Sequence, residues 1–157
     1  MERRLAAILF ADVVGYSLLM GKDETGTLIA VKALWEKLFG PRITEHGGRI
    51  VKLMGDGVLV EFTSVVDAVE CAVEIQRDSA ERNAGVPADR RIEVRIGVNL
   101  GDVIIEDNDI YGDGVNLAAR LEKLAVPSGV ALSATAQEHV AGKVDAYFKD
   151  GGEHELK

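Results

Sequence analysis

The stretch KLMGDG at residues 52–57 lies between two apolar runs, residues 50–54 and residues 58–62. Both runs are rich in Val, Leu, Ile and Phe and predict strands, and the Gly-Asp-Gly between them is short enough to be a hairpin turn. Asp56 is therefore expected at a tight turn between two glycines, where backbone and ligand can approach closely. Most Gly-Asp-Gly turns are only polar turns, so the rest of the sequence decides whether this one belongs to a site.

A second carboxylate stands in an otherwise apolar run upstream. Residues 5–14 (LAAILFADVV) carry one charge, Asp12, and their length and flanks predict a buried central strand. Because burying an unpaired carboxylate costs several kcal/mol, Asp12 needs a partner or a place at the strand end. Two interpretations are about even on this residue alone. Either Asp12 caps the turn at residues 15–17, or it is a metal ligand at the carboxyl end of the strand.

Helices are predicted from capping residues and apolar periodicity. Asp23 caps the first, which should kink or break at the Gly-Pro pair of residues 40–41 and end at the Gly-Gly pair of residues 47–48. A second helix, at residues 64–83, starts with capping-box spacing. A third is expected at residues 115–124.

The later strands follow from side-chain alternation. Residues 92–99 alternate strictly between apolar and polar side chains, which is typical of a strand with one face in water. Gly101 and Asp102 are expected to turn the chain into a second strand at residues 103–105. The remaining predicted elements are a short strand at residues 130–133, a short helix ending at His139 and the start of a strand at residues 147–148.

The predicted order is strand, helix, hairpin, helix, hairpin, helix and strand. Paired strands joined by tight turns and separated by helices indicate an α+β fold. The expected architecture is ferredoxin-like (βαββαβ), with helices packed on a mostly antiparallel sheet. By length, residues 1–157 are expected to form a single domain.

The composition excludes some classes of partner. A net charge of −8 argues against a nucleic-acid surface, because such surfaces need clustered Lys and Arg. No apolar run approaches the roughly 20 residues that span a bilayer, so no membrane segment is expected. The single cysteine, Cys71, has apolar neighbours in a predicted helix and is interpreted as a buried, inert thiol. A reducing, cytoplasmic location fits this composition.

Asp12 and Asp56, predicted on adjacent central strands, can share a divalent cation. Hard Mg²⁺ takes oxygen ligands and usually needs only one or two carboxylates plus substrate phosphates. Two such ions about 4 Å apart are a recurring device for in-line displacement at phosphorus. This interpretation also explains why a charge interrupts the first apolar strand.

Two further pairs carry chemistry. Lys52 and Asp109 form a donor and an acceptor that can read the Watson–Crick edge of adenine, which has an acceptor at N1 and a donor at N6. Asn116 and Arg120 are four residues apart on one predicted helix face. They can supply an amide that orients a ribose and a guanidinium for charge on phosphate. As an isolated pair they would more simply be an exposed helix face.

Taken together, these motifs resemble a known family, the class III nucleotidyl cyclase catalytic domain, which includes adenylate and guanylate cyclases. The resemblance covers nearly the whole chain. It rests on residues 10–17 (FADVVGYS), residues 52–57 (KLMGDG) and residues 109–120 (DIYGDGVNLAAR). Each motif is weak singly, but the three are specific in this order and spacing.

The resemblance implies that Asp12 and Asp56 hold two divalent metal ions, Mg²⁺ or Mn²⁺, with the backbone carbonyl of Val13 as a further ligand. Lys52 and Asp109 match the adenine-selecting pair. Guanylate cyclases typically carry Glu and Cys at these places, so the chain looks like an adenylate cyclase. ATP is thus the implied substrate.

Asn116 and Arg120 match the family's transition-state pair, and Lys157 aligns with a lysine that contacts the triphosphate. In the family the sites form at a head-to-tail dimer interface, which implies a homodimer with two equivalent sites. The implied reaction is attack of the ATP ribose 3′-oxygen on the α-phosphorus, which releases pyrophosphate and closes cyclic AMP. No side chain stands out as a general base.

Two other functions remain as alternatives. A catalytically silent cyclase-like module for regulation, dimerisation or nucleotide sensing would usually lack a metal aspartate or the arginine, and all six positions are filled here. A diguanylate cyclase would need a Gly-Gly-Asp/Glu-Glu-Phe hairpin, which residues 53–57 do not supply. The resemblance also implies a final strand after Lys157 and a regulatory part in a longer parent protein.

Overall fold

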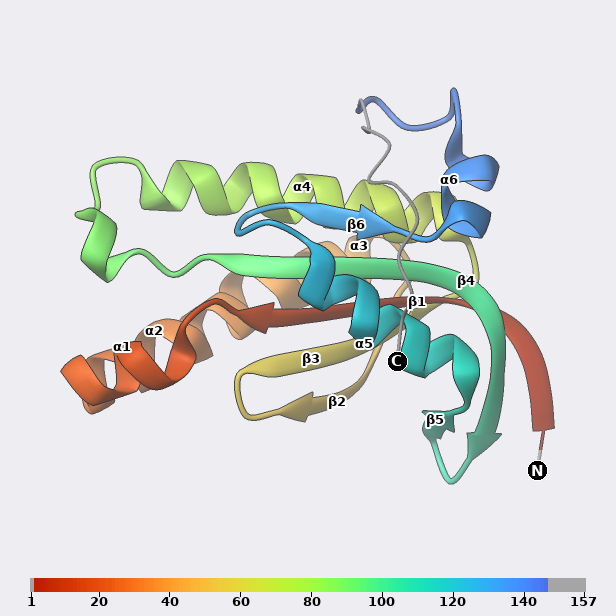
Figure 1. The fold of residues 1–157 in the computed structure, drawn as a ribbon, viewed down its shortest axis with the longest axis horizontal. Coiled ribbons are helices and arrows are strands. Elements are labelled where there is room, and N and C mark those ends of the chain that lie inside the picture. The colour runs from red at the N-terminus through yellow and green to blue at the C-terminus, as the bar shows by residue number, and fades with distance from the viewer. Residues whose placement is uncertain (1, 147–157) are drawn as a thin grey trace.

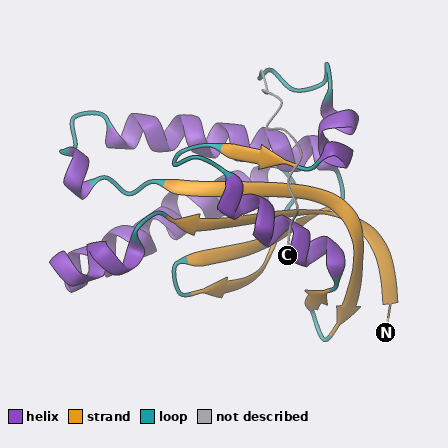
Figure 2. Cartoon of the chain, viewed as in Figure 1, coloured by secondary structure: helices purple, strands orange, loops and turns teal. Residues whose placement is uncertain are grey.

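The computed structural model describes residues 2–146, which form a curled sheet with helices packed on it (Figures 1 and 2). The elements in chain order are β1 (Glu2–Val13), α1 (Tyr16–Lys22), α2 (Glu24–Ala33), the π-helical segment η1 (Leu34–Phe39), α3 (Gly40–Glu45), β2 (Arg49–Met54), β3 (Gly57–Phe62), α4 (Val65–Asn83), the short helical turn η2 (Ala88–Arg90), β4 (Val94–Glu106), β5 (Asp109–Tyr111), α5 (Asp113–Leu124), β6 (Val130–Leu132) and α6 (Ala134–Val140). The strand predicted from residue 147 and the predicted site residue Lys157 lie outside the described residues. Among the helices of residues 2–146, none has the length and apolar character to cross a membrane.

The strand β1 is central, as its apolar sequence predicts. The sheet order is β2-β3-β1-β4-β5, with antiparallel neighbours, while β6 pairs in parallel with β4. A strand with a partner on each edge and packed cores on both faces must be apolar on both sides. The prediction of an α+β, ferredoxin-like sheet is confirmed.

Alternate residues of β1 contribute to two cores. The odd-numbered residues from Ala7 to Val13 belong to the larger core, which includes residues of α2, η1, α3, α4 and α6. Ala6 and Ile8 belong to the smaller core, where Ala118 of α5 packs against the opposite face of the sheet. Figure 1 shows α5 crossing in front of β1 and β4, while α3 lies behind them.

The predicted helix starts and the buried cysteine are confirmed. Asp23, Ser64 and Ser133 cap α2, α4 and α6, and each side chain accepts a hydrogen bond from the backbone N–H three residues on, at 2.9, 3.3 and 3.2 Å. Cys71 is fully buried in α4, and burial raises the pKa of its thiol to about 12. The thiol is therefore not ionised and not nucleophilic near neutral pH.

The expected break at residues 40–41 does not occur. The chain instead passes through the π-helical segment η1 directly into α3. The N–H of Gly40 bonds to the carbonyl of Trp35, five residues back, and this wider turn accommodates Pro41 at the start of α3, where its missing N–H is tolerated. The helix ends at Gly47, whose φ is 73°, as predicted.

The predicted turn at Gly101 and Asp102 is also wrong. Both residues are inside β4, a continuous strand of 13 residues, where they pair with Ala6 and Leu5 of β1. The turn comes instead at Asp107 and Asn108, whose φ values of 52° and 66° suit a two-residue hairpin. As a result, β5 begins at Asp109, and this position matters for the site described below.

Candidate active site

The structure brings Asp12 and Asp56 to adjoining positions. Asp12 is the penultimate residue of β1, and its Cα lies opposite Gly57 of β3. The backbone N–H of Val13 donates to the carbonyl of Asp56 at 3.0 Å, so the end of β1 is tied to the hairpin turn. The side chain of Asp12 is 19% exposed, and Asp56 is half-buried. Two carboxylates so placed offer the oxygen donors that hard divalent cations prefer.

Asp12 has two ionisable neighbours that were not identified from the sequence, Arg95 and Glu122. Arg95 lies opposite Asp12 in β4, and its Nε and Nη2 atoms are 3.4 Å from the Asp12 carboxylate oxygens. The Nε atom of Arg95 is also 3.3 Å from Oε1 of Glu122, a fully buried residue of α5. Alternation put Arg95 on the polar face of its strand, but only the strand register shows which residue it faces.

The Glu122 carboxyl group is the most perturbed acid of this cluster. Burial, together with the hydrogen bond to Asp12 and its charge, raises the pKa of Glu122 to about 8, and the Arg95 guanidinium only partly opposes this rise. Glu122 is therefore mostly protonated at neutral pH. Asp12 is left as the anionic partner of Arg95, and no bare carboxylate pair is buried at this point. Asp12 does not cap the following turn, because the cap of α1 is Gly15, with no side-chain hydrogen bond.

Lys52 and Asp109 form an ion pair, although 57 residues separate them in the chain. The Nζ atom of Lys52 is 3.1 Å from Oδ2 of Asp109, and their side chains are 39% and 28% exposed. The other oxygen, Oδ1, accepts the N–H of Ile110 at 2.8 Å. Burial raises the pKa of Asp109, but the bonds from Ile110 and Lys52 outweigh it, so the pKa of this carboxyl group lies below its usual value. Asp109 is thus a permanent acceptor beside a cationic donor.

Asn116 and Arg120 lie on the exposed side of α5, one helical turn apart. Glu122 is about 200° around the helix from Arg120 and faces the sheet beside Asp12. Asn116 and Arg120 on α5 therefore face a different direction from Asp12 at the end of β1 within one protomer. Of the other predicted site residues, Val13 is the buried last residue of β1, and Lys157 is outside the described part of the chain.

The approach of α5 to the sheet depends on Gly97 of β4. A Cβ at this position would lie 2.4 Å from the backbone nitrogen of Glu122 and 2.6 Å from the carbonyl oxygen of Ala118. Only glycine lets the two backbones come this close. Gly97 therefore sets the distance between α5 and the sheet, and with it the positions of the side chains that the helix carries.

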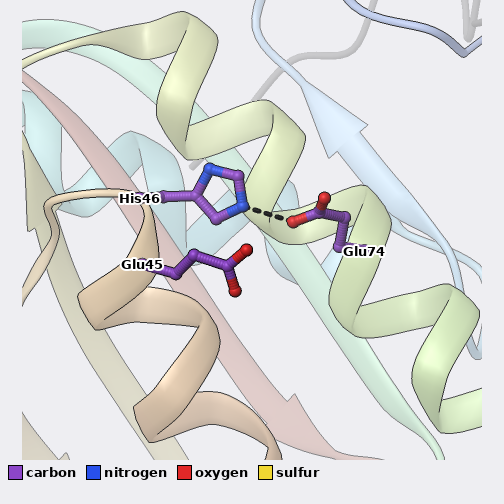
Figure 3. Close-up of side chains that lie close together, drawn as sticks. All are labelled: Glu45, His46 and Glu74. Atoms are coloured by element: carbon purple, nitrogen blue, oxygen red, sulfur yellow. Dashed lines mark hydrogen bonds and ion pairs between the residues drawn. The ribbon is translucent and has the colours of Figure 1, made fainter.

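A second group of charged side chains joins α3 to α4, whose residues belong to the larger core (Figure 3). The His46 imidazole contacts the Glu74 carboxylate, and Glu45 lies beside them. Arg42 binds Asp78 at 2.7 Å and lies 3.6 Å from Glu74. His46, which follows the last residue of α3, is thus a helix-end residue with a polar partner. Arg42 pairs with Asp78 and Glu74, and His46 contacts Glu74, so these side chains link the end of α3 to α4.

Comparison with known proteins identifies relatives over the full length of the chain. The family described as "Adenylate and Guanylate cyclase catalytic domain" matches residues 2–157. "Putative adenylate cyclase 3" of Rhizobium meliloti is 53% identical over 156 residues, which are 99% of this chain and 27% of that protein. An adenylate cyclase of Streptomyces coelicolor is 32% identical over 92% of this chain and 36% of its own length. The chain thus spans about a third or less of these curated relatives.

Solved structures show the same fold. The adenylate/guanylate cyclase/hydrolase from Silicibacter pomeroyi superposes with a TM-score of 0.94 at 43% identity, covering 99% of this chain and 91% of that one. A bacterial light-regulated adenylyl cyclase gives a TM-score of 0.83 at 25% identity, covering 99% of this chain and 50% of that one. The strand order and the packing of α5 described above are therefore those of a group of proteins known as cyclases.

Proposed function

The chain belongs to the adenylate and guanylate cyclase catalytic domain family, and from this premise we propose that it is an adenylate cyclase, which converts ATP to 3′,5′-cyclic AMP and pyrophosphate. The observation that carries the choice of ATP is the ion pair between Lys52 and Asp109. A cationic donor beside an anionic acceptor complements the adenine edge, which accepts at N1 and donates at N6. The adenylate cyclase names of two relatives support the same choice.

Guanine would face the wrong groups in this arrangement. It presents a donor at N1 and an acceptor at O6, the reverse of adenine, so each group of the pair would meet a group of its own kind. A base-reading pair of this type contributes about 1–3 kcal/mol of discrimination. The low pKa of Asp109 strengthens the preference, because a carboxylate that stays ionised cannot donate a hydrogen bond.

Asp12 and Asp56 are the residues that would hold the divalent cations of the reaction, Mg²⁺ or Mn²⁺, with the Val13 carbonyl as a further oxygen. Their adjoining positions and oxygen donors fit such ions. When bound, two ions supply activation of the 3′-hydroxyl and neutralisation of phosphate charge. Arg95 holds one side of the Asp12 carboxylate and limits the charge that this pocket carries before nucleotide arrives.

The helix α5 carries the two other residues that we assign to the reaction. Asn116 orients the ribose, and the Arg120 guanidinium stabilises the charge that develops as the 3′-oxygen attacks the α-phosphorus. Both side chains point away from Asp12 within the protomer, so a second protomer must bring its α5 to the aspartates. This arrangement supports a homodimer with two sites. The exposed apolar side chains of Leu53 and Met54 on the β2–β3 hairpin support a covering partner.

The chain would act as the catalytic part of a longer protein. It covers 27% and 36% of the two adenylate cyclases compared, so most of each relative lies outside the matched region. A regulatory part in the parent protein fits this proportion. Lys157 remains a candidate contact for the triphosphate, and the proposed substrate ATP supports a cytoplasmic location.

The proposal is tested by giving the purified chain ATP or GTP with Mg²⁺ or Mn²⁺ and measuring both cyclic nucleotides by chromatography. We expect cyclic AMP from ATP, abolished by EDTA. Lys52→Glu combined with Asp109→Cys should shift the preference towards GTP, whereas the matched changes Lys32→Glu and Asp89→Cys at exposed positions should not. Preferential formation of cyclic GMP by the wild-type chain would overturn the proposal.

A further inference from the structure

Tyr111 is an aromatic residue beside the Lys52–Asp109 pair that the proposed mechanism does not use. It is the last residue of β5, two positions after Asp109, and 48% of its surface is exposed. The Nζ atom of Lys52 lies 5.9 Å from the centroid of its ring, within the range of a cation–π interaction. Packing alone does not explain why a half-exposed tyrosine lies beside the two residues that are proposed to read the base.

The phenol group of Tyr111 also interacts with the other member of the pair. The negative charge of Asp109, followed by hydrogen bonding to it and by burial, raises the pKa of Tyr111 above its usual value. The hydroxyl group therefore keeps its proton in the field of the carboxylate. One side chain thus interacts with both the cation and the anion that are proposed to read the base.

The backbone fixes Tyr111 in this place. Ile110 between the two residues is 1% exposed and packs in the smaller core, so Asp109 and Tyr111 both project to the other side of β5. The preceding turn is tied to β2, because Nη1 of Arg49 donates to the carbonyl of Asn108 at 3.1 Å. The strand that carries Tyr111 is therefore held against the strand that carries Lys52.

We propose that Tyr111 is a positioning residue that determines the preference for ATP over GTP, by holding the Lys52 ammonium and the Asp109 carboxylate in the geometry that fits adenine. This inference rests on the proposed function, since it assigns a part in substrate selection at the same site. It adds a third member to a pair that family resemblance describes as two residues.

The physical reason is the flexibility of lysine. Lys52 has a four-carbon stem, and its side chain is 39% exposed, so its ammonium group has many alternative positions in water. The ring of Tyr111 restricts these positions before the base arrives, and the hydroxyl restrains the carboxylate. A preorganised pair loses less conformational entropy on binding than a mobile one, and it discriminates more sharply between the two bases.

Two substitutions separate the contributions of ring and hydroxyl. Tyr111→Leu removes both, and we expect kcat/KM for ATP to fall about tenfold, mainly through KM, while the value for GTP changes less than about twofold. Tyr111→Phe keeps the ring, and a fall of about threefold is expected. Val126→Ala, an exposed apolar position after α5, is the control and should leave both values unchanged.

Steady-state rates are measured with each nucleotide. Dissociation constants for ATP and GTP are measured by calorimetry in buffer depleted of metal ions. Thermal unfolding shows whether each variant is folded. If Tyr111→Leu does not fold, Tyr111→Phe decides. A merely structural role would lower the rates for ATP and GTP equally. If the wild type prefers ATP and the folded variants keep the same ratio of kcat/KM for ATP to kcat/KM for GTP, the inference is overturned. The proposed function would then still stand.

Other outcomes are equally decisive. If the wild type binds ATP more tightly than GTP but forms no cyclic nucleotide, the proposed function fails. The ratio of dissociation constants then tests Tyr111 by the same criterion. A wild type without preference between the two nucleotides, or one that neither binds nor converts them, would overturn the role of Tyr111 together with the choice of ATP.

Discussion

Asp12 shows how a charge is accommodated in a central strand. Its neighbours are Arg95, which is paired with it across β1 and β4, and Glu122, which is neutral at ordinary pH because its pKa is raised to about 8. The carboxylate is therefore balanced by one guanidinium rather than left alone in an apolar environment. A carboxylate proposed to bind a cation can in this way be kept inside the sheet at little cost to stability.

The residues that form functional pairs were easier to predict from the sequence than the side chains that surround them. Lys52 and Asp109 were predicted from chemistry as a donor and an acceptor that read adenine, and in the structure they form an ion pair with each other. Arg95 was missed because a strand that alternates apolar and polar residues places many charged side chains on its polar face. Only the register of β4 against β1 distinguishes the one that meets Asp12.

The proposed metal role of Asp56 leads to the first prediction. Asp56→Ala should lower cyclic AMP formation by about a thousandfold or more, because one of the two carboxylates proposed to hold the cations is lost. The residue is half-buried in a turn, so the free energy of unfolding should change by less than about 1 kcal/mol. Turnover assays and urea unfolding measure the two effects. Asp89→Ala, at an exposed helical turn, is the control, and wild-type turnover in Asp56→Ala would refute the assignment.

At the scale of elements, β4 shows where local rules fail. Gly101-Asp102 is a typical turn sequence, yet the pairing of both residues with β1 keeps the strand continuous through them. The ladder to β1 outweighs the local preference, because breaking it would leave buried backbone groups without partners. The true turn, Asp107-Asn108, has equally typical turn residues, so the sequence contains two candidates and only long-range pairing selects one.

The close contact of β4 with α5 gives the second prediction. Gly97→Ala places a methyl group against the backbone of α5 at Glu122 and Ala118, where little can move, and should lower the free energy of unfolding by about 1–3 kcal/mol. Cyclase activity should fall as well, since α5 carries Asn116 and Arg120. Urea unfolding and turnover test both parts.

The matched control is Gly21→Ala in α1, where an added Cβ meets nothing within 4 Å. That change should leave activity intact and stabilise the chain slightly, because alanine is the better helix former. Equal unfolding midpoints for Gly97→Ala and the wild type would show that α5 is free to shift.

A cross-strand ion-pair network gives the third prediction, which concerns pH. Glu61 of β3 binds Arg4 of β1 at 2.7 Å and Arg49 of β2 at 3.0 Å. Burial raises the pKa of Glu61, but the two guanidinium groups outweigh it and hold the pKa below the ordinary 4.5. The stability from this network is therefore fully present above about pH 4.5 and is lost as the pH falls through the lower folded-state pKa.

Glu61→Gln removes the titrating group. We expect the variant to be less stable than the wild type at neutral pH and to lose less stability in acid, because its amide does not bind a proton there. Urea midpoints measured from pH 7 downwards test this, with the exposed Glu81→Gln as control. Parallel curves for Glu61→Gln and the wild type would contradict the assignment.

At the scale of the whole molecule, the fold was predictable because its main signals are local. The apolar run of residues 5–14, the Gly-Asp-Gly hairpin and the capped helices each specify one element, and together they leave few ways to build the sheet. The continuity of η1 with α3 was not predictable, since Gly-Pro usually ends a helix and the wider π turn depends on packing of Trp35 and Phe39 in the core.

The fourth prediction concerns assembly. Asp56→Ala and Arg120→Ala should each be inactive alone, but co-expressed chains should recover about a quarter of wild-type activity, because half of the dimers are mixed and each of these has one complete site. Turnover and sedimentation of the separated and co-expressed proteins check this. Dimers that form normally but stay inactive when mixed would show that the two residues act within one protomer.

The central place of β1 has a consequence for the order in which the chain is made. β1 is synthesised first, yet its two neighbours, β3 and β4, come much later, and Asp12 is 83 residues from the Arg95 that it faces. Contacts so distant in sequence form slowly, after the intervening loop has been closed. On the ribosome, Asp12 emerges before every other proposed site residue, and β4, the last long strand, is synthesised much later. A nascent chain that stops short of β4 contains Asp12 and its neighbour β3 but lacks the Arg95 that faces this carboxylate.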